Sequence, residues 1–311
     1  MRIWIVGAGA IGLMYASRLA RASVNVTMLT RTAAQAEALG RKGILFEAYG
    51  SGAKHAVPVQ AKPIAELREV AESEDWIWLT VKQTHLTDDL LTALARLGSG
   101  GASVLCLQNG IGHMERLREA LPETQLYAAI STEGALRTNE AAVRHTGAGE
   151  LVFGMWQQAA AETLATQKML LDILEAAGIE GLMSNEMVNR VYQKLLINAV
   201  INPLSAIFGV TNGELPADPG RRQLMAALHA ESEAALIAGG MNGDGDAWER
   251  LLTVCRRTAR NESSMLADVK SGRMTEIDSI NGGIATIARE HGLKTPLNDA
   301  LITIVKALTL N

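Results

Sequence analysis

The chain is poor in the residues that mark several protein classes. Of its 311 residues only two are cysteines, Cys106 and Cys255, and both lie in apolar surroundings without metal-ligand spacing. We therefore expect reduced core residues in a reducing compartment, not a disulfide. The six histidines are also scattered, and no Walker loop or Ser/Cys–His arrangement is present. The sequence predicts neither a metal site nor a nucleophilic hydrolase site.

Excess charge and long apolar runs are also lacking. The formal net charge is −4, which favours neither nucleic acid nor an anionic membrane as a partner. Beyond the N-terminal segment no 18 consecutive apolar residues occur, so no membrane span is predicted. The N-terminal apolar run is interrupted by Gly7, Gly9 and Gly12, which argues against a signal peptide. The expected location is the cytoplasm.

The composition that is present suits a globular protein, with 48% hydrophobic and 20% charged residues. Strand patterns fill the first half of the chain and only helix patterns follow Met183. We predict a Rossmann-type α/β domain over residues 1–184 and an all-α domain over 185–311. The strands are expected at 3–6, 24–29, 75–81, 103–107, 126–130 and 178–183, with a hairpin or paired edge strands in 142–155. The helices are expected to follow residue 12 and at 163–177, 186–208, 221–238, 247–260, 276–291 and 297–308.

The strongest single motif is GAGAIG at residues 7–12, between a strand pattern and a helix pattern. In the dinucleotide-binding fingerprint, Gly7 permits the tight turn, Gly9 lets a pyrophosphate approach and Gly12 lets helix and strand pack closely. The N–H groups at the helix start would face the phosphates. The alternative is a glycine turn that binds nothing. The expected cofactor-binding residues are Gly7, Ala8, Gly9, Ala10, Ile11 and Gly12.

Three further polar residues follow predicted strands. Arg31 stands where an NAD site usually carries an acid, and an arginine there can pair with the 2′-phosphate of NADP; a solvated surface arginine is the alternative. Lys82 follows the strand at 75–81, at the sheet edge where α/β proteins place ligands. Asn109 follows the strand at 103–107 and either points into a cofactor crevice or forms an Asn-Gly turn.

The helix pattern at residues 191–206 carries an unusual polar stripe. Lys194, Asn198 and Asn202 are spaced by four, which places them on one helix face, and nearly everything between them is apolar. A buried helix with such a stripe would line a cleft for a small polar ligand; the wet edge of a surface helix is the alternative. Pro203 is expected to end or kink the helix after Asn202.

Three small polar clusters lie in the second half, at residues 211–213, 261–265 and 275–278. Taken alone, the first fits a plain turn. The second and third fit helix caps, since Ser, Asn and Thr favour N-caps and acids favour the first helical turn.

Taken together, these motifs resemble the ketopantoate reductase, or 2-dehydropantoate 2-reductase, family. The resemblance spans nearly the whole chain and departs from the family at none of the motif positions. The segments that carry it are GAGAIG, Arg31, LTVK ending at Lys82, QNG around Asn109, KLLINAVINPLSA from Lys194, TNGEL around Asn212, NESSMLADV and TEIDSINGG.

The resemblance implies a dinucleotide-binding domain, a helical domain and an active site in the cleft between them. It implies NADPH-dependent reduction of 2-dehydropantoate to (R)-pantoate, a step toward pantothenate and coenzyme A. By the same resemblance, Lys194 is the general acid and Glu276 binds the substrate hydroxyl. The implied substrate contacts are Asn109, Asn198, Asn202, Asn212, Asn261 and Ser264, and the implied cofactor contacts include Arg31, Lys82, Asn109 and Glu276.

The residue types suit that reaction. Hydride addition to a ketone puts negative charge on the carbonyl oxygen, which an ammonium can stabilise and protonate. A nearby carboxylate favours the protonated amine. The asparagines and Ser264 can donate to a substrate carboxylate without adding charge.

Two alternatives remain open. One is an NADPH-dependent reductase of a different small 2-keto acid on the same scaffold. The other is a non-catalytic NADPH-sensing regulator, which the Lys194 and Glu276 pair disfavours because sensing needs no proton donor. The expected partner is a small 2-keto acid, without nucleic acid or membrane, bound by a monomer or homodimer.

Overall fold

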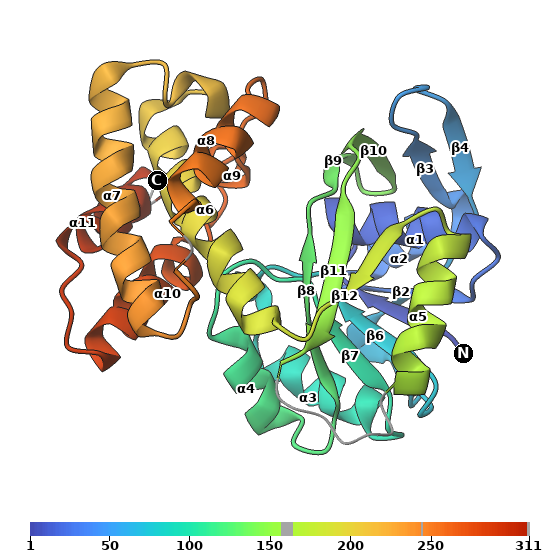
Figure 1. The fold of residues 1–311 in the computed structure, drawn as a ribbon. Helices are drawn as coiled ribbons and strands as arrows, with labels where there is room; N and C mark the ends of the chain where they lie inside the picture. The colour runs from blue at the N-terminus through green and yellow to red at the C-terminus, as the bar shows by residue number, and fades with distance from the viewer. Residues whose placement is uncertain (157–163, 244, 310–311) are drawn as a thin grey trace. The chain divides into compact units, whose positions relative to one another are not determined.

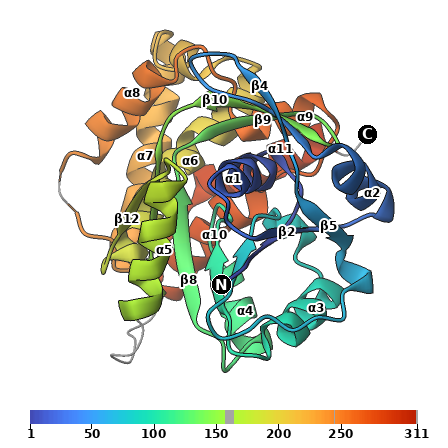
Figure 2. The ribbon, with the colours of Figure 1, turned by 90° about the vertical axis from the view of Figure 1, so that its right-hand side faces the viewer.

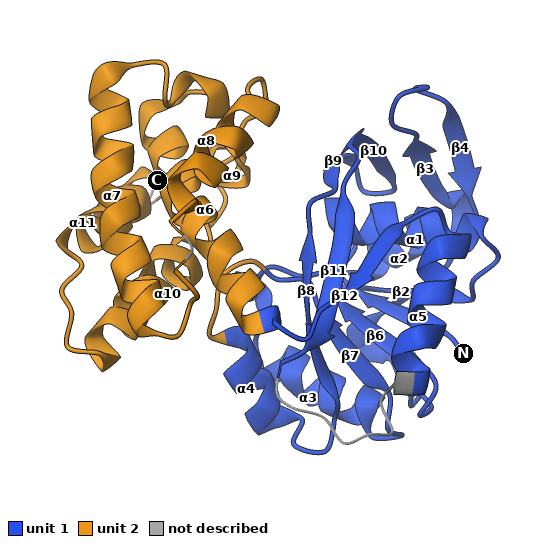
Figure 3. Ribbon diagram, viewed as in Figure 1, with its two compact units in different colours: residues 1–108, 113–187 blue, residues 109–112, 188–311 orange. Residues whose placement is uncertain are grey.

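The computed structural model describes residues 1–156, 164–243 and 245–309 and divides the chain into two compact units (Figure 3). Unit 1 comprises Met1–Gln108 and His113–Met187, and unit 2 comprises Asn109–Gly112 and Val188–Asn311. The segment Asn109–Gly112 therefore packs with residues far along the chain, a feature that the sequence did not indicate.

Unit 1 is built on an eight-stranded sheet with the order β12-β11-β8-β7-β6-β1-β2-β5. Neighbouring strands are parallel except β8 and β11, which run antiparallel. The central strands are buried along their whole length, as expected where helices cover both faces. The strands are β1 (Ile3–Val6), β2 (Val26–Thr30), β5 (Gln60–Pro63), β6 (Trp76–Leu79), β7 (Ser103–Cys106), β8 (Leu126–Ser131), β11 (Glu150–Met155) and β12 (Glu180–Met183).

Helices cover this sheet on two sides, with α1 and α2 on one side and α3 and α4 on the other (Figure 2). Of the expected helix at 163–177, the structure describes the part from Leu164, and Thr163 lies outside the described residues. The elements are α1 (Ala10–Arg21), α2 (Ala33–Lys42), α3 (Asp88–Gly98), α4 (His113–Ala120) and α5 (Leu164–Ala176), with short 3-10 turns η1 (Ile64–Glu66) and η2 (Gln83–His85).

A second sheet packs over α1 (Figures 1 and 2). It has the order β4-β3-β10-β9 and consists of β3 (Ile44–Glu47), β4 (Lys54–Val57), β9 (Gly134–Asn139) and β10 (Ala142–Gly147). The expected pairing within residues 142–155 is wrong, because β10 pairs with β9 and β3 while β11 pairs with β8 and β12. The true hairpin turns one strand earlier, where the Asn139 side chain accepts a hydrogen bond from the Ala141 N–H.

Among the described residues of unit 2 the regular elements are all helices, as predicted. Two apolar clusters share the central helix α6, one through Leu195 and Ala199 and the other through Val200 and Leu204. The helix α9 was not expected, because its short segment begins in the polar cluster at 261–265. The elements are α6 (Met187–Phe208), η4 (Asn212–Glu214), α7 (Pro219–Ala238), α8 (Ala247–Arg257), α9 (Ser264–Lys270), α10 (Ile277–Glu290) and α11 (Pro296–Leu308).

The expected helix over 186–208 is confirmed as α6, and of the two outcomes expected at Pro203 an end of the helix is wrong, since α6 continues through Pro203 to Phe208. Proline cannot donate to the carbonyl four residues earlier, which belongs to Ala199. That carbonyl instead accepts a hydrogen bond of 2.9 Å from the side chain of Asn281. By length and composition α6 is also apolar enough to cross a membrane, but 56% of its most apolar window is buried, as in the core helix of a globular unit.

Candidate active site

The glycine turn between β1 and α1 is required by close packing. Gly7 has φ +114°, and a Cβ there would lie 2.9 Å from the Thr80 hydroxyl, which donates to the Gly7 carbonyl at 2.9 Å. A Cβ on Gly12 would come within 2.0 Å of the same carbonyl oxygen. Both glycines therefore let α1 approach β1 and β6, as the motif predicts.

Gly9 differs from its neighbours because a Cβ at this position would meet nothing within 4 Å. Gly9 is the N-cap of α1, no side chain caps that end, and no acid lies in the first turn. The first N–H groups of a helix lack partners within the helix, and its N-terminus carries partial positive charge. The turn thus offers open space and donors, which fits the pyrophosphate of a dinucleotide.

Arg31 and Lys82 flank this turn within unit 1. Strand β1 pairs in parallel with β2 on one side and β6 on the other. Gly7, Arg31 and Lys82 therefore follow the carboxyl ends of three adjacent strands. Arg31 is exposed and Lys82 is half-buried. The structure places both at the carboxyl edge of the sheet, where α/β folds generally bind ligands.

Two residues at the glycine turn were missed by the sequence reasoning. The Gln35 amide donates to the Ala8 carbonyl at 3.0 Å, and the Arg137 guanidinium reaches the same oxygen at 3.4 Å. Arg137 lies on β9, 129 residues after Ala8, so no local spacing could have revealed it. It brings a positive charge to the edge of the expected phosphate site.

In unit 2 the polar stripe of α6 has the expected composition and burial. Asn202 is buried, while Lys194 and Asn198 are half-buried, on a helix whose other sides face the two apolar clusters. Burial lowers the pKa of Lys194 from its usual value near 10.5 to about 8, and the negative charge of Glu276 opposes that shift. Lys194 and Glu276 therefore interact, although 82 residues separate them in the sequence (276 − 194).

Glu276 is itself buried, at 6% exposure, directly before α10. The Asn109 amide donates to its carboxylate at 3.3 Å. The turn that holds Asn109 is fixed against α10, since the Ile111 N–H donates to the Ser279 carbonyl and a Cβ on Gly110 would lie 2.4 Å from that oxygen. Lys194, Glu276 and Asn109 thus gather in one unit, and the role of Asn109 toward a cofactor stays a prediction.

Asn212 and Asn261 are joined by a backbone hydrogen bond of 3.0 Å. The Asn212 amide nitrogen is already used, because it donates to the Thr258 hydroxyl at 2.9 Å. Its buried carbonyl oxygen has no hydrogen-bond partner among the described residues. Asn261 and Ser264 are exposed. For Asn212 the structure therefore favours acceptance from a ligand over donation to one.

The start of α9 is tied to α6 by two serines that the sequence analysis did not single out. The Ser205 hydroxyl, on α6, lies 2.7 Å from the Ser263 hydroxyl and 3.1 Å from the Asn202 carbonyl oxygen, within hydrogen-bond distance of both. Ser263 is the N-cap of α9 and accepts from the Leu266 N–H at 3.0 Å. This link fixes the beginning of α9, where Ser264 stands, against the turn of α6 that carries Asn202.

The residue types at these places limit the chemistry available. Across residues 1–156, 164–243 and 245–309, no three histidine, cysteine or carboxylate side chains come together as a metal site would require. Both cysteines are buried, and burial raises the pKa of each thiol, that of Cys255 to about 11. Unit 1 carries the glycine turn of the dinucleotide motif, and unit 2 carries a lysine–carboxylate–amide group.

Comparison with known proteins gives the same family along both halves of the chain. Residues 3–158 match the family described as "Ketopantoate reductase PanE/ApbA", and residues 186–309 match its C-terminal counterpart. The 2-dehydropantoate 2-reductase of Bacillus subtilis (strain 168) is 32% identical over 311 residues, covering 100% of this chain and 98% of the relative. The enzyme of the same name from Halobacterium salinarum is 30% identical, covering 98% of each chain.

Solved structures extend the likeness to a second named activity. A crystal structure of a probable 2-dehydropantoate 2-reductase from Bacillus subtilis matches with TM-score 0.83 and 31% identity, over 99% of this chain and 100% of the other. A ternary structure of D-mandelate dehydrogenase with NADH and anilino(oxo)acetate matches with TM-score 0.88 and 25% identity, over 99% and 98%.

Proposed function

Because the chain belongs to the ketopantoate reductase family, we propose that it reduces 2-dehydropantoate to (R)-pantoate, the step toward pantothenate, with NADPH as cofactor. The observation that carries the proposal is the interaction of Lys194 with Glu276 in unit 2. A lysine with a pKa of about 8 is still largely protonated at neutral pH and releases its proton more readily than an exposed lysine.

Lys194 acts on the carbonyl oxygen of the substrate. A bound nicotinamide would supply the hydride to the keto carbon, and negative charge would then develop on that oxygen. The Lys194 ammonium stabilises this charge and transfers its proton to the oxygen, which completes the alcohol. The neutral amine that remains recovers its proton from solvent.

Glu276 keeps this lysine charged and is held in place by Asn109. Its negative charge raises the lysine pKa against the effect of burial. The Asn109 amide donates to the carboxylate at 3.3 Å, which orients the group. In the proposed complex, the second Glu276 oxygen accepts a hydrogen bond from the substrate hydroxyl.

The asparagine stripe binds the rest of the substrate. Asn198 lies one helical turn after Lys194 and Asn202 one turn further, so their amides follow the lysine along the same face. We assign Asn198, Asn202, Asn261 and Ser264 to donation toward the substrate carboxylate, and Asn212 to a contact with substrate or cofactor in which its carbonyl oxygen accepts. These groups add no net charge to the site.

The glycine turn holds the pyrophosphate of the cofactor, with Lys82 and Arg137 as nearby positive charges. Arg31 supports the preference for NADPH because no acid follows β2, where an NAD-specific site would bind the ribose hydroxyls. A guanidinium pairs well with the 2′-phosphate.

The test is the oxidation of NADPH, followed by absorbance, with 2-dehydropantoate beside a panel of branched, linear and aromatic 2-keto acids. A kcat/KM for 2-dehydropantoate at least tenfold above the panel, about 1.4 kcal/mol in transition-state binding, supports the assignment. Tight NADPH binding without turnover of any keto acid would instead indicate a regulator.

The likeness to D-mandelate dehydrogenase favours one specific competitor, an aromatic 2-keto acid. If phenylglyoxylate gives the highest kcat/KM, the lysine mechanism stands and the substrate changes. In that case NADH should be compared with NADPH as the cofactor for the same keto acid, because the D-mandelate dehydrogenase structure is a complex with NADH.

A further inference from the structure

A cavity lies in unit 1 at the end of α1 opposite the glycine turn. Its volume is about 470 Å³, a size typical of small-molecule sites. The helix rises by about 1.5 Å per residue, so its two ends lie roughly 18 Å apart. The cavity is therefore separate from the dinucleotide turn. The side chains that give it its chemistry are Arg18, Arg21, Phe46, Tyr49 and His145.

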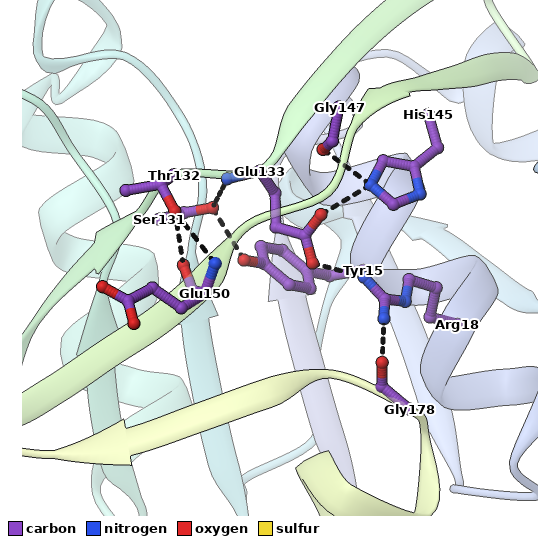
Figure 4. A network of polar contacts seen from close by, with 9 residues as sticks. All are labelled: Tyr15, Arg18, Ser131, Thr132, Glu133, His145, Gly147, Glu150 and Gly178. Atoms are coloured by element: carbon purple, nitrogen blue, oxygen red, sulfur yellow. Dashed lines mark hydrogen bonds and ion pairs between the residues drawn. The ribbon is translucent and has the colours of Figure 1, made fainter. Parts of the chain in front are cut away.

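One wall is a closed polar network built on the buried carboxylate of Glu133 (Figure 4). Arg18 donates to one carboxylate oxygen and to the Gly178 carbonyl. The other carboxylate oxygen lies 2.5 Å from Nε2 of His145, which also lies 2.9 Å from the Gly147 carbonyl. Since both contacts of Nε2 are acceptors, this nitrogen carries the proton. The negative charge of Glu133 is thus paired with Arg18 within the wall and does not repel an anion in the cavity.

Arg21 supplies the positive charge that is available to a ligand in the cavity. It is exposed, and its guanidinium lies 5.8 Å from the centre of the Phe46 ring. Within the described part of the chain Arg21 forms no ion pair with a carboxylate. The C-terminal end of α1 contributes only about half a negative charge, so the net charge at the mouth of the cavity is positive.

Aromatic rings form part of the remaining surface, and the other lining residues are Ala22, Ala48, Ala176, Ala177 and Gly178. The His145 ring stacks on Phe46, with centres 6.4 Å apart and planes at 27°. Tyr49 also lines the cavity, with its ring centre 5.5 Å from that of His145, and is 54% exposed. Exposed tyrosine beside a fixed ring offers a stacking platform for a flat ligand.

We propose that this cavity binds an aromatic anion, namely a flat ring that carries a carboxylate or a phosphate. The ring stacks against Tyr49 and His145, and the negative group pairs with Arg21. An inorganic anion would leave the rings unused, and an uncharged ring would leave Arg21 unpaired.

The probes are phenyl phosphate and benzoate, titrated calorimetrically into protein saturated with NADPH so that the dinucleotide turn is already filled. Inorganic phosphate and phenol serve as controls that lack the ring or the charge. We expect at least one aryl anion to bind saturably, with a Kd at least tenfold below that of either control. The ranking of phenyl phosphate against benzoate identifies the anionic group.

Two variants test whether the aryl anion binds in this cavity. Arg21→Gln and Tyr49→Leu should each raise the Kd of the better aryl anion about tenfold or more. Arg144→Gln is the matched control, because Arg144 neighbours His145 on β10 but pairs with Glu47 at 2.6 Å and does not line the cavity. Both cavity positions are exposed, so thermal melting should show that the fold is unchanged.

Three results would overturn the proposal. They are no saturable binding of either aryl anion, binding equal to that of inorganic phosphate, or an affinity that Arg21→Gln and Tyr49→Leu leave unchanged. The last would place the aryl anion elsewhere, for example in the keto acid site.

Discussion

The side-chain amide of Asn281 on α10 lies 2.9 Å from the carbonyl oxygen of Ala199 on α6, the group that Pro203 leaves without its helical donor. Asn281 is completely buried and also donates to Asn298 at 2.9 Å. Asn298 in turn donates to Glu231, whose carboxylate accepts the first N–H groups of α11. One amide thus lets α6 run through a proline and joins it to three other helices.

A double-mutant cycle tests whether the Asn281 amide replaces the backbone N–H that is missing at Pro203. Asn281→Ala should destabilise the protein by about 1–3 kcal/mol, because it leaves the buried Ala199 carbonyl unsatisfied. Pro203→Ala restores a backbone N–H that can donate to the same carbonyl. Asn281→Ala should therefore cost about 1 kcal/mol less in the Pro203→Ala background than in the native one. Urea denaturation of the four proteins gives the coupling free energy.

Thr286→Ala is the control for this cycle, since Thr286 lies on α10 but its hydroxyl bonds only to Gly282 within its own helix. It should show no coupling to Pro203→Ala. If Asn281→Ala and Pro203→Ala are strictly additive, the Asn281 amide is not the replacement donor.

Glycine has two proposed roles in the turn: Gly9 leaves room for the cofactor and Gly12 permits close packing. Mutation of each residue tests these roles separately. Gly9→Ala should leave the melting temperature nearly unchanged, because its Cβ would meet no atom within 4 Å, yet it should weaken NADPH binding tenfold or more. Gly12→Ala should destabilise the protein outright, since its Cβ would lie 2.0 Å from the Gly7 carbonyl oxygen. Melting curves and cofactor titration distinguish the two; equal effects on both measurements would contradict this division.

Much of the fold could be predicted because local patterns and packing agree. The parallel strands β1, β6 and β7 are buried on both faces and appear in the sequence as continuous apolar runs. The second sheet was missed because its strands are partly exposed and mix polar with apolar residues, as in β4 with the pattern KHAV, so neither alternation nor apolarity identifies them. The helix α6 was predicted, but its course beyond Pro203 depends on Asn281, which is a tertiary contact.

In the candidate site, too, local patterns could be predicted from the sequence and long-range contacts could not. The spacing of four on α6 and the glycine motif are local, so Lys194, Asn198 and Gly9 could be found from the sequence. That Asn109 joins unit 2 and bonds to Glu276 is a contact across 167 residues, which no spacing reveals. Arg137 was missed for the same reason.

Arg31 decides the cofactor preference in our proposal. Arg31→Ala should reduce the ratio of kcat/KM with NADPH to that with NADH by roughly tenfold, about 1.4 kcal/mol, because the charge-assisted contact to the 2′-phosphate is lost. Arg41→Gln, an exposed arginine at the far end of α2, removes an equal charge and should leave the ratio unchanged. A ratio that does not respond to Arg31→Ala would rule out this residue as the phosphate contact.

Lys194→Ala should lower kcat by about 100-fold or more, since it removes the group that protonates the developing oxyanion. NADPH should still bind, because the glycine turn belongs to unit 1. Steady-state kinetics and cofactor titration by fluorescence measure the two effects. Turnover near the native rate would exclude Lys194 as the proton donor.

The pH dependence of the reduction follows from the lysine pKa of about 8. Only the protonated amine can donate, so kcat/KM should fall as the pH rises through about 8 and should be level below it. Glu276 raises this pKa, so Glu276→Gln should move the alkaline limb to lower pH, whatever its effect on the maximal rate.

Asp278→Asn is the matched control, because this exposed acid lies two residues away and pairs with Lys306 at 2.6 Å. The control should leave the limb in place. A limb that stays at the same pH in Glu276→Gln would mean that this carboxylate does not govern the proton donor, and the role of Glu276 would then be confined to holding the substrate.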